Sequence, residues 1–211
     1  MTGVADSMAA TSLGSPKRRT RQQLLEAARG VFLKAGYHGA KLDDIAAEAG
    51  FTKGALYWHF PNKQSLFLAL IADSIDTNLR TLDGFLELGQ ADPAALKTRI
   101  SEWIEGIDER ETLPAFGVEL EIESRRDVRF RAIHQQIIAG HESALTDFLT
   151  QYFRLVGEAP PMPVAELASS LITISKGFAL ARPNRTDDSP TSAACVRLLM
   201  GLPPGRPARP R

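Results

Sequence analysis

The sequence lacks most of the features that mark secreted, membrane-spanning or disulfide-stabilised proteins. Cys195 is the only cysteine in 211 residues, so no intramolecular disulfide can form, and a reducing cytoplasm is the expected compartment. No apolar run approaches the roughly 20 residues that a membrane-spanning helix needs. The basic cluster at 17–21 is not followed by the apolar stretch of a signal peptide. We therefore expect a cytoplasmic protein with no membrane partner.

The motifs of common enzyme classes are also missing. The sequence has no Gly-x-Ser-x-Gly, no phosphate-binding glycine loop, no HExxH and no cysteine cluster. One alternative is an acid–base site made of His134, His141 and the acidic set Glu119, Glu121 and Glu123. Such scattered charges on helices are normally solvated. We expect no enzymatic activity, no catalytic residues and no cofactor.

Zero net charge hides an uneven distribution of charge along the chain. Between Pro16 and Lys63 there are nine basic and four acidic residues, which gives that segment +5 and leaves −5 for the remainder. A basic front on an acidic body indicates a polyanionic partner at the N-terminal end only.

Helical patterns fill the chain between two tails that we expect to be disordered, 1–16 and 201–211. Thr20 and Gln23 have the spacing of a capping box and predict the start of the first helix, which Gly36 ends. Further helices are predicted at about 42–49, 52–60, 62–88, 93–108, 127–152, 163–181 and 190–200, several of them opened by the capping residues Thr52, Asn62, Asp92 and Ser189.

One segment leaves two interpretations open. Residues Val118–Glu123 alternate apolar and acidic side chains, as a strand would. A lone strand has no partners for its backbone, so we predict a helix here as well. The expected fold class is therefore all-α, with about nine helices.

The short helices at 42–49 and 52–60 predict a helix-turn-helix. Ala46 lets the next helix cross closely, and Gly50 permits the tight turn between the two. If Thr52, Leu56, His59 and Phe60 face the interior, Lys53 and Gly54 face outward together with the aromatic pair Tyr57-Trp58. This pair would either be packed under another helix or lie in the major groove of DNA, where a nearby glycine allows close approach.

Basic residues surround this helix. Lys53 and Lys63 are expected to pair with phosphates. The run Lys17–Arg21 is either a solvated tail or a flexible arm on the DNA backbone.

These residues closely resemble the TetR family of bacterial repressors over about 50 positions. The matching residues are Arg21–Ala28, Val31-Phe32, Gly36-Tyr37, Asp44-Ile45-Ala46, Ala49-Gly50, Phe51–Phe60 (FTKGALYWHF), Lys63 and Leu66-Phe67. The resemblance implies a DNA-binding domain at 17–67 and a helical ligand-binding and dimerisation domain at 68–200. It also implies a homodimer that binds double-stranded operator DNA and is released by a small-molecule effector. The implied DNA-binding residues are Arg21, Lys41, Thr52, Lys53, Gly54, Ala55, Tyr57, Trp58, His59 and Lys63.

Two positions depart from the family pattern. At Ala40-Lys41 the family usually places Thr or Ser, which caps the second helix; a lysine ammonium accepts no hydrogen bond, so we expect Lys41 to leave that helix uncapped. Ala55 replaces a polar base-reading side chain of some members, which favours recognition by shape and apolar contact.

In the second domain the sequence contains no recognisable ligand-binding motif and offers only single candidate residues for a ligand site. Apolar or aromatic residues on long helices, together with two histidines, are the predicted ligand-binding set: Trp103, Ile107, Phe116, Leu120, His134, Ile137, His141, Phe148 and Ile172. Many of these would otherwise be core residues. His134 and His141 are about 10 Å apart along a helix, too far for one metal ion, so no metal is expected.

The apolar series of the last two helices is the predicted dimer interface: Leu167, Leu171, Ile174, Phe178, Val196 and Leu199. The alternative is ordinary packing within one chain. A twofold dimer would read two half-sites about 34 Å apart. A ligand-independent regulator or an activator of the same fold remains a second possibility.

Overall fold

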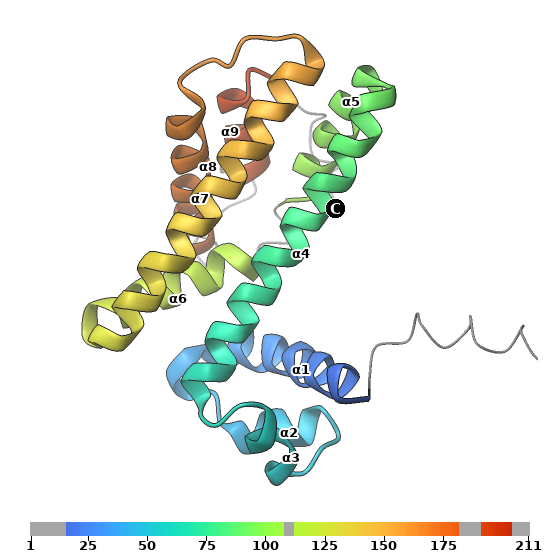
Figure 1. Cartoon of the computed structure of the whole chain (residues 1–211). Helices are drawn as coiled ribbons and strands as arrows, with labels where there is room; N and C mark the ends of the chain where they lie inside the picture. Colours follow the sequence, from blue (N-terminus) through green and yellow to red (C-terminus); the bar gives the residue numbers. More distant parts are fainter. Residues whose placement is uncertain (1–15, 108–111, 182–190, 204–211) are drawn as a thin grey trace, which may run out of the picture. The chain divides into compact units, whose positions relative to one another are not determined.

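The computed structural model describes residues 16–107, 112–181 and 191–203, and every regular element within those ranges is helical. Nine helices, α1 to α9, fall in this described part of the chain, which confirms the all-α prediction (Figure 1). The chain divides into two compact units, one ending at Leu70 and the other beginning at Ile71. The predicted tails were 1–16 and 201–211. Residues 1–15 and 204–211 lie outside the described residues, whereas Pro16 belongs to a helix and 201–203 are described without helical structure.

The first unit contains α1 (Pro16–Gly39), α2 (Leu42–Glu48) and α3 (Lys53–His59). The capping-box prediction at Thr20 was wrong, because α1 already begins at Pro16. Proline suits a first helical position, since its fixed φ is helical and its missing N–H is not needed there. The predicted stop at Gly36 appears as a break inside α1, where φ is 68°.

A small apolar core holds these helices together. Leu24 and Leu25 of α1, Ile45 of α2 and Leu56 of α3 are fully buried. Beside them, the ring of Phe67 lies 5.0 Å from that of Phe32 and 4.9 Å from that of Tyr37. These contacts fix the orientation of α3, a helix of only seven residues.

Side-chain caps set the limits of several helices as predicted. The Ala55 N–H donates to Thr52 Oγ1 at 3.2 Å at the start of α3, and the Ser65 N–H donates to Asn62 Oδ1 at 2.8 Å at the start of α4 (Lys63–Ala91). Asp92 Oδ1 accepts two backbone N–H groups at the start of α5 (Pro93–Glu105). Lys41 forms no such bond, as its chemistry predicts.

The second unit is built from most of α4 and from α5, α6 (Thr112–Arg126), α7 (Val128–Val156), α8 (Val164–Ala181) and α9 (Ser192–Leu199). The alternating segment Val118–Glu123 lies inside α6, so the helical interpretation was correct. The predicted cap Ser189 lies outside the described residues; Thr191 Oγ1 accepts the Ala194 N–H and caps α9.

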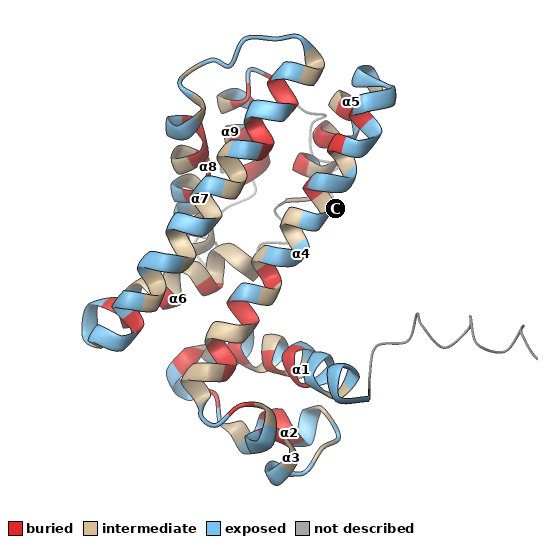
Figure 2. Ribbon diagram, viewed as in Figure 1, coloured by how far each residue is buried: buried red, intermediate tan, exposed pale blue. Residues whose placement is uncertain are grey.

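Buried residues line the facing sides of these helices (Figure 2). Tyr152 of α7 and Leu167 of α8 are fully buried, and Ile100 of α5 is 2% exposed. Arg197 of α9 is also buried; its guanidinium donates to the Pro203 and Ser101 carbonyls and so satisfies its buried donors. The second unit therefore has its own core, independent of the first.

Two glycines of α4 differ in their surroundings and provide a test of this packing. A Cβ at Gly89 would overlap the side chain of Leu96, whereas a Cβ at Gly84 would meet open space. We predict that Gly89→Ala lowers stability by about 1–3 kcal/mol through overpacking, and that Gly84→Ala raises it by up to about 1 kcal/mol through helix propensity. Thermal melting of both variants measures this; equal melting temperatures would contradict the α4–α5 packing.

Candidate functional site

Helix α3 presents an aromatic face to solvent. Trp58 is 63% exposed and Tyr57 is 42% exposed, while Leu56 and Phe60 are buried. The predicted outer face is therefore correct, and so is the inward position of Leu56 and Phe60. The inward placement of Thr52 was wrong, because this residue is exposed, and His59 is half-buried. In the part of the chain that the structure describes, no other helix covers the Tyr57-Trp58 pair.

Gly54 lies on the same exposed side of α3, and the fold itself does not require a glycine there. A Cβ at this position would meet only the Thr52 hydroxyl, at 3.9 Å, which is an ordinary contact. A glycine inside a helix costs about 1 kcal/mol relative to alanine. The position is thus suited to an approach from outside the molecule.

The basic residues at the start of α1 lie beside α3. Lys17 Nζ is 4.2 Å from the centre of the Trp58 ring, and the Arg21 guanidinium carbon is 5.3 Å from the Phe60 ring. Partial burial, with smaller contributions from Lys17 and Arg21, lowers the pKa of His59 below its usual value. The flexible-arm hypothesis is wrong for 17–21, because these residues are helical, and Lys17 and Arg21 lie against the Trp58 and Phe60 rings.

Two other cations of the predicted set already have partners. Lys53 Nζ lies 2.8 Å from an Asp43 carboxylate oxygen, and this bond raises the pKa of Lys53. Lys63 Nζ donates to the carbonyls of His38 at 3.0 Å and Ala40 at 3.1 Å, and it lies 4.9 Å from the Tyr37 ring. The Lys53–Asp43 ion pair is exposed at the surface, so it is weak and another anion can replace Asp43. Lys63 stabilises the end of α1.

The ten predicted DNA-contacting residues all belong to the first unit, and none is fully buried. Seven are exposed: Arg21, Lys41, Thr52, Lys53, Gly54, Tyr57 and Trp58. Ala55, His59 and Lys63 are half-buried. The sequence missed two participants on this surface, Lys17 as the neighbour of Trp58 and Asp43 as the partner of Lys53; only the three-dimensional fold brings these pairs together.

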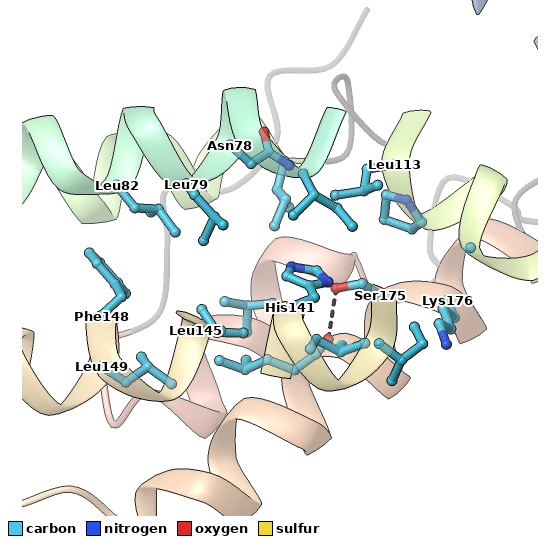
Figure 3. A pocket seen from close by; sticks show the side chains of 18 of the residues that line it. Asn78, Leu79, Leu82, Leu113, His141, Leu145, Phe148, Leu149, Ser175 and Lys176 are labelled. Atoms are coloured by element: carbon cyan, nitrogen blue, oxygen red, sulfur yellow. Dashed lines mark hydrogen bonds between the residues drawn. The ribbon is translucent and has the colours of Figure 1, made fainter. Parts of the chain in front are cut away.

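The second unit encloses an apolar pocket of about 160 Å³. Its walls come from α4 to α9, and Leu79, Leu82, Leu145, Leu149 and Phe148 lie together at one end in Figure 3. A cavity of about 150 Å³ lined by similar side chains holds benzene. A shallower groove adjoins it between α4 and α7 and shares Ile75, Leu79, Ile137 and His141 with it.

Seven of the nine predicted ligand-binding residues line this pocket: Trp103, Ile107, Leu120, Ile137, His141, Phe148 and Ile172. Phe116 and His134 do not. Phe116 is a buried core residue, and His134 Nε2 lies 3.2 Å from a carboxylate oxygen of Glu121, away from the lining. Both residues lie on faces of their helices that do not line the pocket, and spacing along the sequence did not reveal this.

Apart from His141, the polar residues of the lining were not predicted. Asn78 of α4 and Ser175 and Lys176 of α8 also line the pocket. Nothing in a single polar residue on an amphipathic helix distinguishes a pocket wall from a solvated face. In the described residues, no group of three or more His, Cys, Asp or Glu side chains is arranged to hold a metal ion.

The predicted dimer residues fall into two groups. Leu167, Leu171 and Val196 are buried within the chain, so their side chains pack inside one protomer, as the alternative interpretation expected. Ile174, Phe178 and Leu199 are half-buried, and the sequence missed two strongly exposed leucines, Leu180 at 66% and Leu198 at 78%.

Helix α8 is the most apolar long helix among the described residues. Its 18 residues, with mean hydropathy 1.3 and 22% of them buried, are long and apolar enough to cross a membrane by length and composition alone. A helix that packs its outer face against another protein helix meets the same two criteria, so this property alone does not place α8 in a membrane.

Residues of the first unit are similar to a family of known proteins. Residues 24–70 match the family described as bacterial regulatory proteins, tetR family. The transcriptional activator FasR of Mycolicibacterium smegmatis is 46% identical over 61 residues, which is 29% of this chain and 28% of FasR. The uncharacterised regulator YfiR of Bacillus subtilis is 27% identical over 170 residues, 77% of this chain and 79% of YfiR. The first of these matches therefore spans less than a third of its relative.

Solved structures extend the likeness to the whole fold. The transcriptional regulator FadR of Bacillus subtilis, solved in complex with stearoyl-CoA, superposes with a TM-score of 0.61 at 18% identity, over 85% of this chain and 95% of FadR. At this identity the likeness concerns the fold alone.

The position of Lys63 leads to a stability prediction. Lys63→Met removes two charge-assisted hydrogen bonds to the end of α1, so we expect a loss of about 1.5–3 kcal/mol and a lower melting temperature. Lys41→Met, at an exposed lysine whose side chain caps no helix, is the matched control and should change stability by less than about 0.5 kcal/mol. Equal effects of the two variants would show that the Lys63 bonds do not stabilise the fold.

Proposed function

We propose that this chain, whose residues 24–70 match the tetR family of bacterial regulatory proteins, is a transcriptional regulator that binds an operator duplex as a homodimer. The proposal places α3 in the major groove. It assigns DNA contacts to Arg21, Lys41, Lys53 and Lys63 at phosphates, and to the α3 residues Thr52, Gly54, Ala55, Tyr57, Trp58 and His59 at or near the bases. The protein would act in the cytoplasm.

The observation that carries this proposal is the outer face of α3. Trp58 is 63% exposed and leaves a large apolar surface in water, and Gly54, one turn before it, costs the helix about 1 kcal/mol relative to alanine although its Cβ position has room for a side chain. Both features become favourable when the helix lies against bases, since apolar surface contacts thymine methyl groups and the missing side chain shortens the approach. Local charge of +5 supplies the attraction to phosphate.

Half-site geometry supports a homodimer. One helix of seven residues reads few base pairs, and a twofold pair of such helices reads two half-sites. We propose that the exposed part of α8 and α9, including Ile174, Phe178, Leu180, Leu198 and Leu199, forms the interface. Apolar helices that remain exposed on one protomer are typical of surfaces covered by a partner.

The pocket supports regulation by a ligand. Helix α4 is continuous from Lys63 in the first unit to the pocket-lining residues Ile71 and Leu82 in the second. A ligand that shifts this helix would change how the two α3 helices are spaced, and a coupling of about 1–3 kcal/mol would weaken operator binding 5- to 150-fold. We propose repression relieved by a small, largely apolar effector.

The second candidate is a regulator of the same fold that activates transcription or needs no ligand. Two observations favour keeping it. FasR, the first relative above, is described as an activator, and the pocket of about 160 Å³ is smaller than the roughly 300 Å³ at which drug-sized sites begin.

The direct test uses Gly54→Ala and a duplex selected from a random pool with the native protein. Alanine should raise the melting temperature, because it improves helix propensity by about 1 kcal/mol without an internal clash. It should weaken binding to the selected duplex by at least about tenfold, since the methyl group enters the protein–DNA contact. If the stabilised variant binds DNA as well as the native protein does, α3 is not the reading helix.

A pair of neighbouring acids tests the role of Lys53. Asp43→Asn releases Lys53 from its ion pair, while Asp44→Asn changes net charge equally without touching that pair. We expect Asp43→Asn to increase affinity for the selected duplex more than Asp44→Asn does, by roughly two- to fivefold at low salt, because a freed ammonium is available for phosphate. Fluorescence anisotropy at several salt concentrations measures the difference; identical gains would exclude a contact by Lys53.

A further inference from the structure

The polar residues of the pocket are few and are not evenly spread. Among its 25 lining residues, Asn78, His141, Ser175 and Lys176 are the polar ones. In Figure 3 the apolar residues Leu79, Leu82, Leu145, Phe148 and Leu149 gather toward the left, whereas Lys176 lies toward the right, below the apolar Leu113. The pocket is therefore amphipathic, with one apolar end and another end where Lys176 lies among apolar residues.

Lys176 is the charged residue of this lining, and its charge is only partly neutralised. Its Nζ lies 3.9 Å from a carboxylate oxygen of Glu121, beyond hydrogen-bond distance. The same carboxylate also lies 3.2 Å from His134 Nε2 and 3.5 Å from the Arg125 guanidinium. One carboxylate shared among three groups leaves the ammonium of Lys176 with unused donors.

The Lys176 side chain is also held in place. It is 23% exposed, and its methylene stem lies against Gly117 of α6, where a Cβ would be 3.3 Å from Lys176 Cε. A lysine in such a position samples fewer rotamers than a fully exposed lysine, so it loses less conformational entropy when it binds a partner.

His141 and Asn78 add hydrogen-bonding groups without partners. Within the described residues, neither the His141 ring nor the Asn78 amide makes a hydrogen bond to protein. Burial, and secondarily the charge of Lys176, lowers the pKa of His141, with Glu142 opposing. The ring is therefore neutral near pH 7 and offers one donor and one acceptor. Ser175 is different, because its hydroxyl donates to the Leu171 carbonyl at 2.8 Å.

From this arrangement we propose that the effector of the pocket is a small organic acid: an apolar chain or single ring that carries one carboxylate, paired with Lys176 and hydrogen-bonded by His141. This inference rests on the proposed ligand-regulated function and specifies the chemistry of its effector. The apolar end of the pocket holds the hydrocarbon part. Asn78 faces the pocket from α4, so the acid also contacts the helix that continues into the DNA-binding unit.

Charge and size both favour a monoanion. One ammonium matches one carboxylate, whereas a phosphate or a coenzyme A ester brings two or more negative charges into a unit whose own charge is acidic. A cavity of about 160 Å³ holds a ring or a short chain, near the volume known to enclose benzene. Desolvation inside the pocket strengthens the ion pair relative to water.

Calorimetry on the full chain, with matched acids and amides, tests the proposal. The probes are octanoic acid against octanamide and 3-phenylpropanoic acid against its amide, because each pair has the same shape and differs in charge. We expect the acid of at least one pair to bind at least about tenfold more tightly than its amide. Equal affinities within both pairs, or no binding of either acid, would overturn the proposal.

Two variants locate the interaction. Lys176→Met should reduce the acid's affinity by about tenfold or more and leave the amide within about twofold. Lys97→Met is the matched control, since Lys97 pairs with Glu158 at the surface and does not line the pocket; it should change neither affinity. If Lys176→Met lowers the melting temperature strongly, Lys176→Gln and the acid–amide comparison on the native protein decide the matter. Unchanged acid binding in both Lys176 variants contradicts the inference.

The same preparations separate this inference from the proposed function. Binding of the native protein to the selected duplex is measured without probe and with each probe. If the duplex is bound but neither acid nor amide binds, the effector chemistry is wrong and the DNA-binding function stands. If the acid binds with the predicted preference but does not change duplex affinity, the effector chemistry stands and the ligand switch is wrong. If the native protein binds no duplex in the absence of a probe, the proposed DNA-binding function is contradicted, and the acid–amide comparison still tests the chemistry of the pocket.

Discussion

Burial of Leu56 and Phe60 is the constraint on which the proposed DNA contact depends. Helix α3 has only seven residues, too few to be stable alone, so its rotation is set by the two side chains that it buries in the first unit. Once they are inside, Tyr57 and Trp58 must point outward and Gly54 must lie on the open side. The orientation of the reading face is thus a consequence of core packing rather than of any interaction made by that face.

Two basic residues beside α3 have partners that phosphate groups could replace. Lys17 stands over Trp58 and Lys53 is paired with Asp43, both in solvent-exposed positions where such contacts contribute little. Phosphate groups can replace these partners at small cost. Lys63 differs, because its ammonium holds two backbone carbonyls at the end of α1. The family resemblance assigns Lys53 and Lys63 alike to DNA contact, whereas the structure gives them two different physical roles.

Local chemistry explains why helix caps and turns were predictable and the pocket was less so. The caps at Thr52 and Asn62 and the turn at Gly50 in the first unit, and the cap at Asp92 in the second, depend on residues within a few positions of each other, so sequence reveals them directly. The start of α1 was misjudged because Pro16 and Thr20 are both acceptable openings. Pocket residues depend on how six helices rotate against one another, which helical periodicity does not encode; this is why Phe116 and His134 were assigned to the lining and Lys176 was not. The dimer interface depends on a second chain, and an apolar helical stripe does not show whether it packs within one protomer or against a partner. Leu167, Leu171 and Val196 are buried within one protomer.

Trp58 also provides the most direct probe of the central claim, that the outer face of α3 lies against DNA. Trp58 and Trp103 are the two tryptophans of the chain, so Trp103→Phe leaves Trp58 as the sole emitter. Titrating a selected duplex into this variant should quench the Trp58 emission and shift it to shorter wavelength, and Trp58 should become protected from acrylamide. A duplex that binds at the same concentration while Trp58 keeps its emission and its full accessibility to acrylamide would contradict the account.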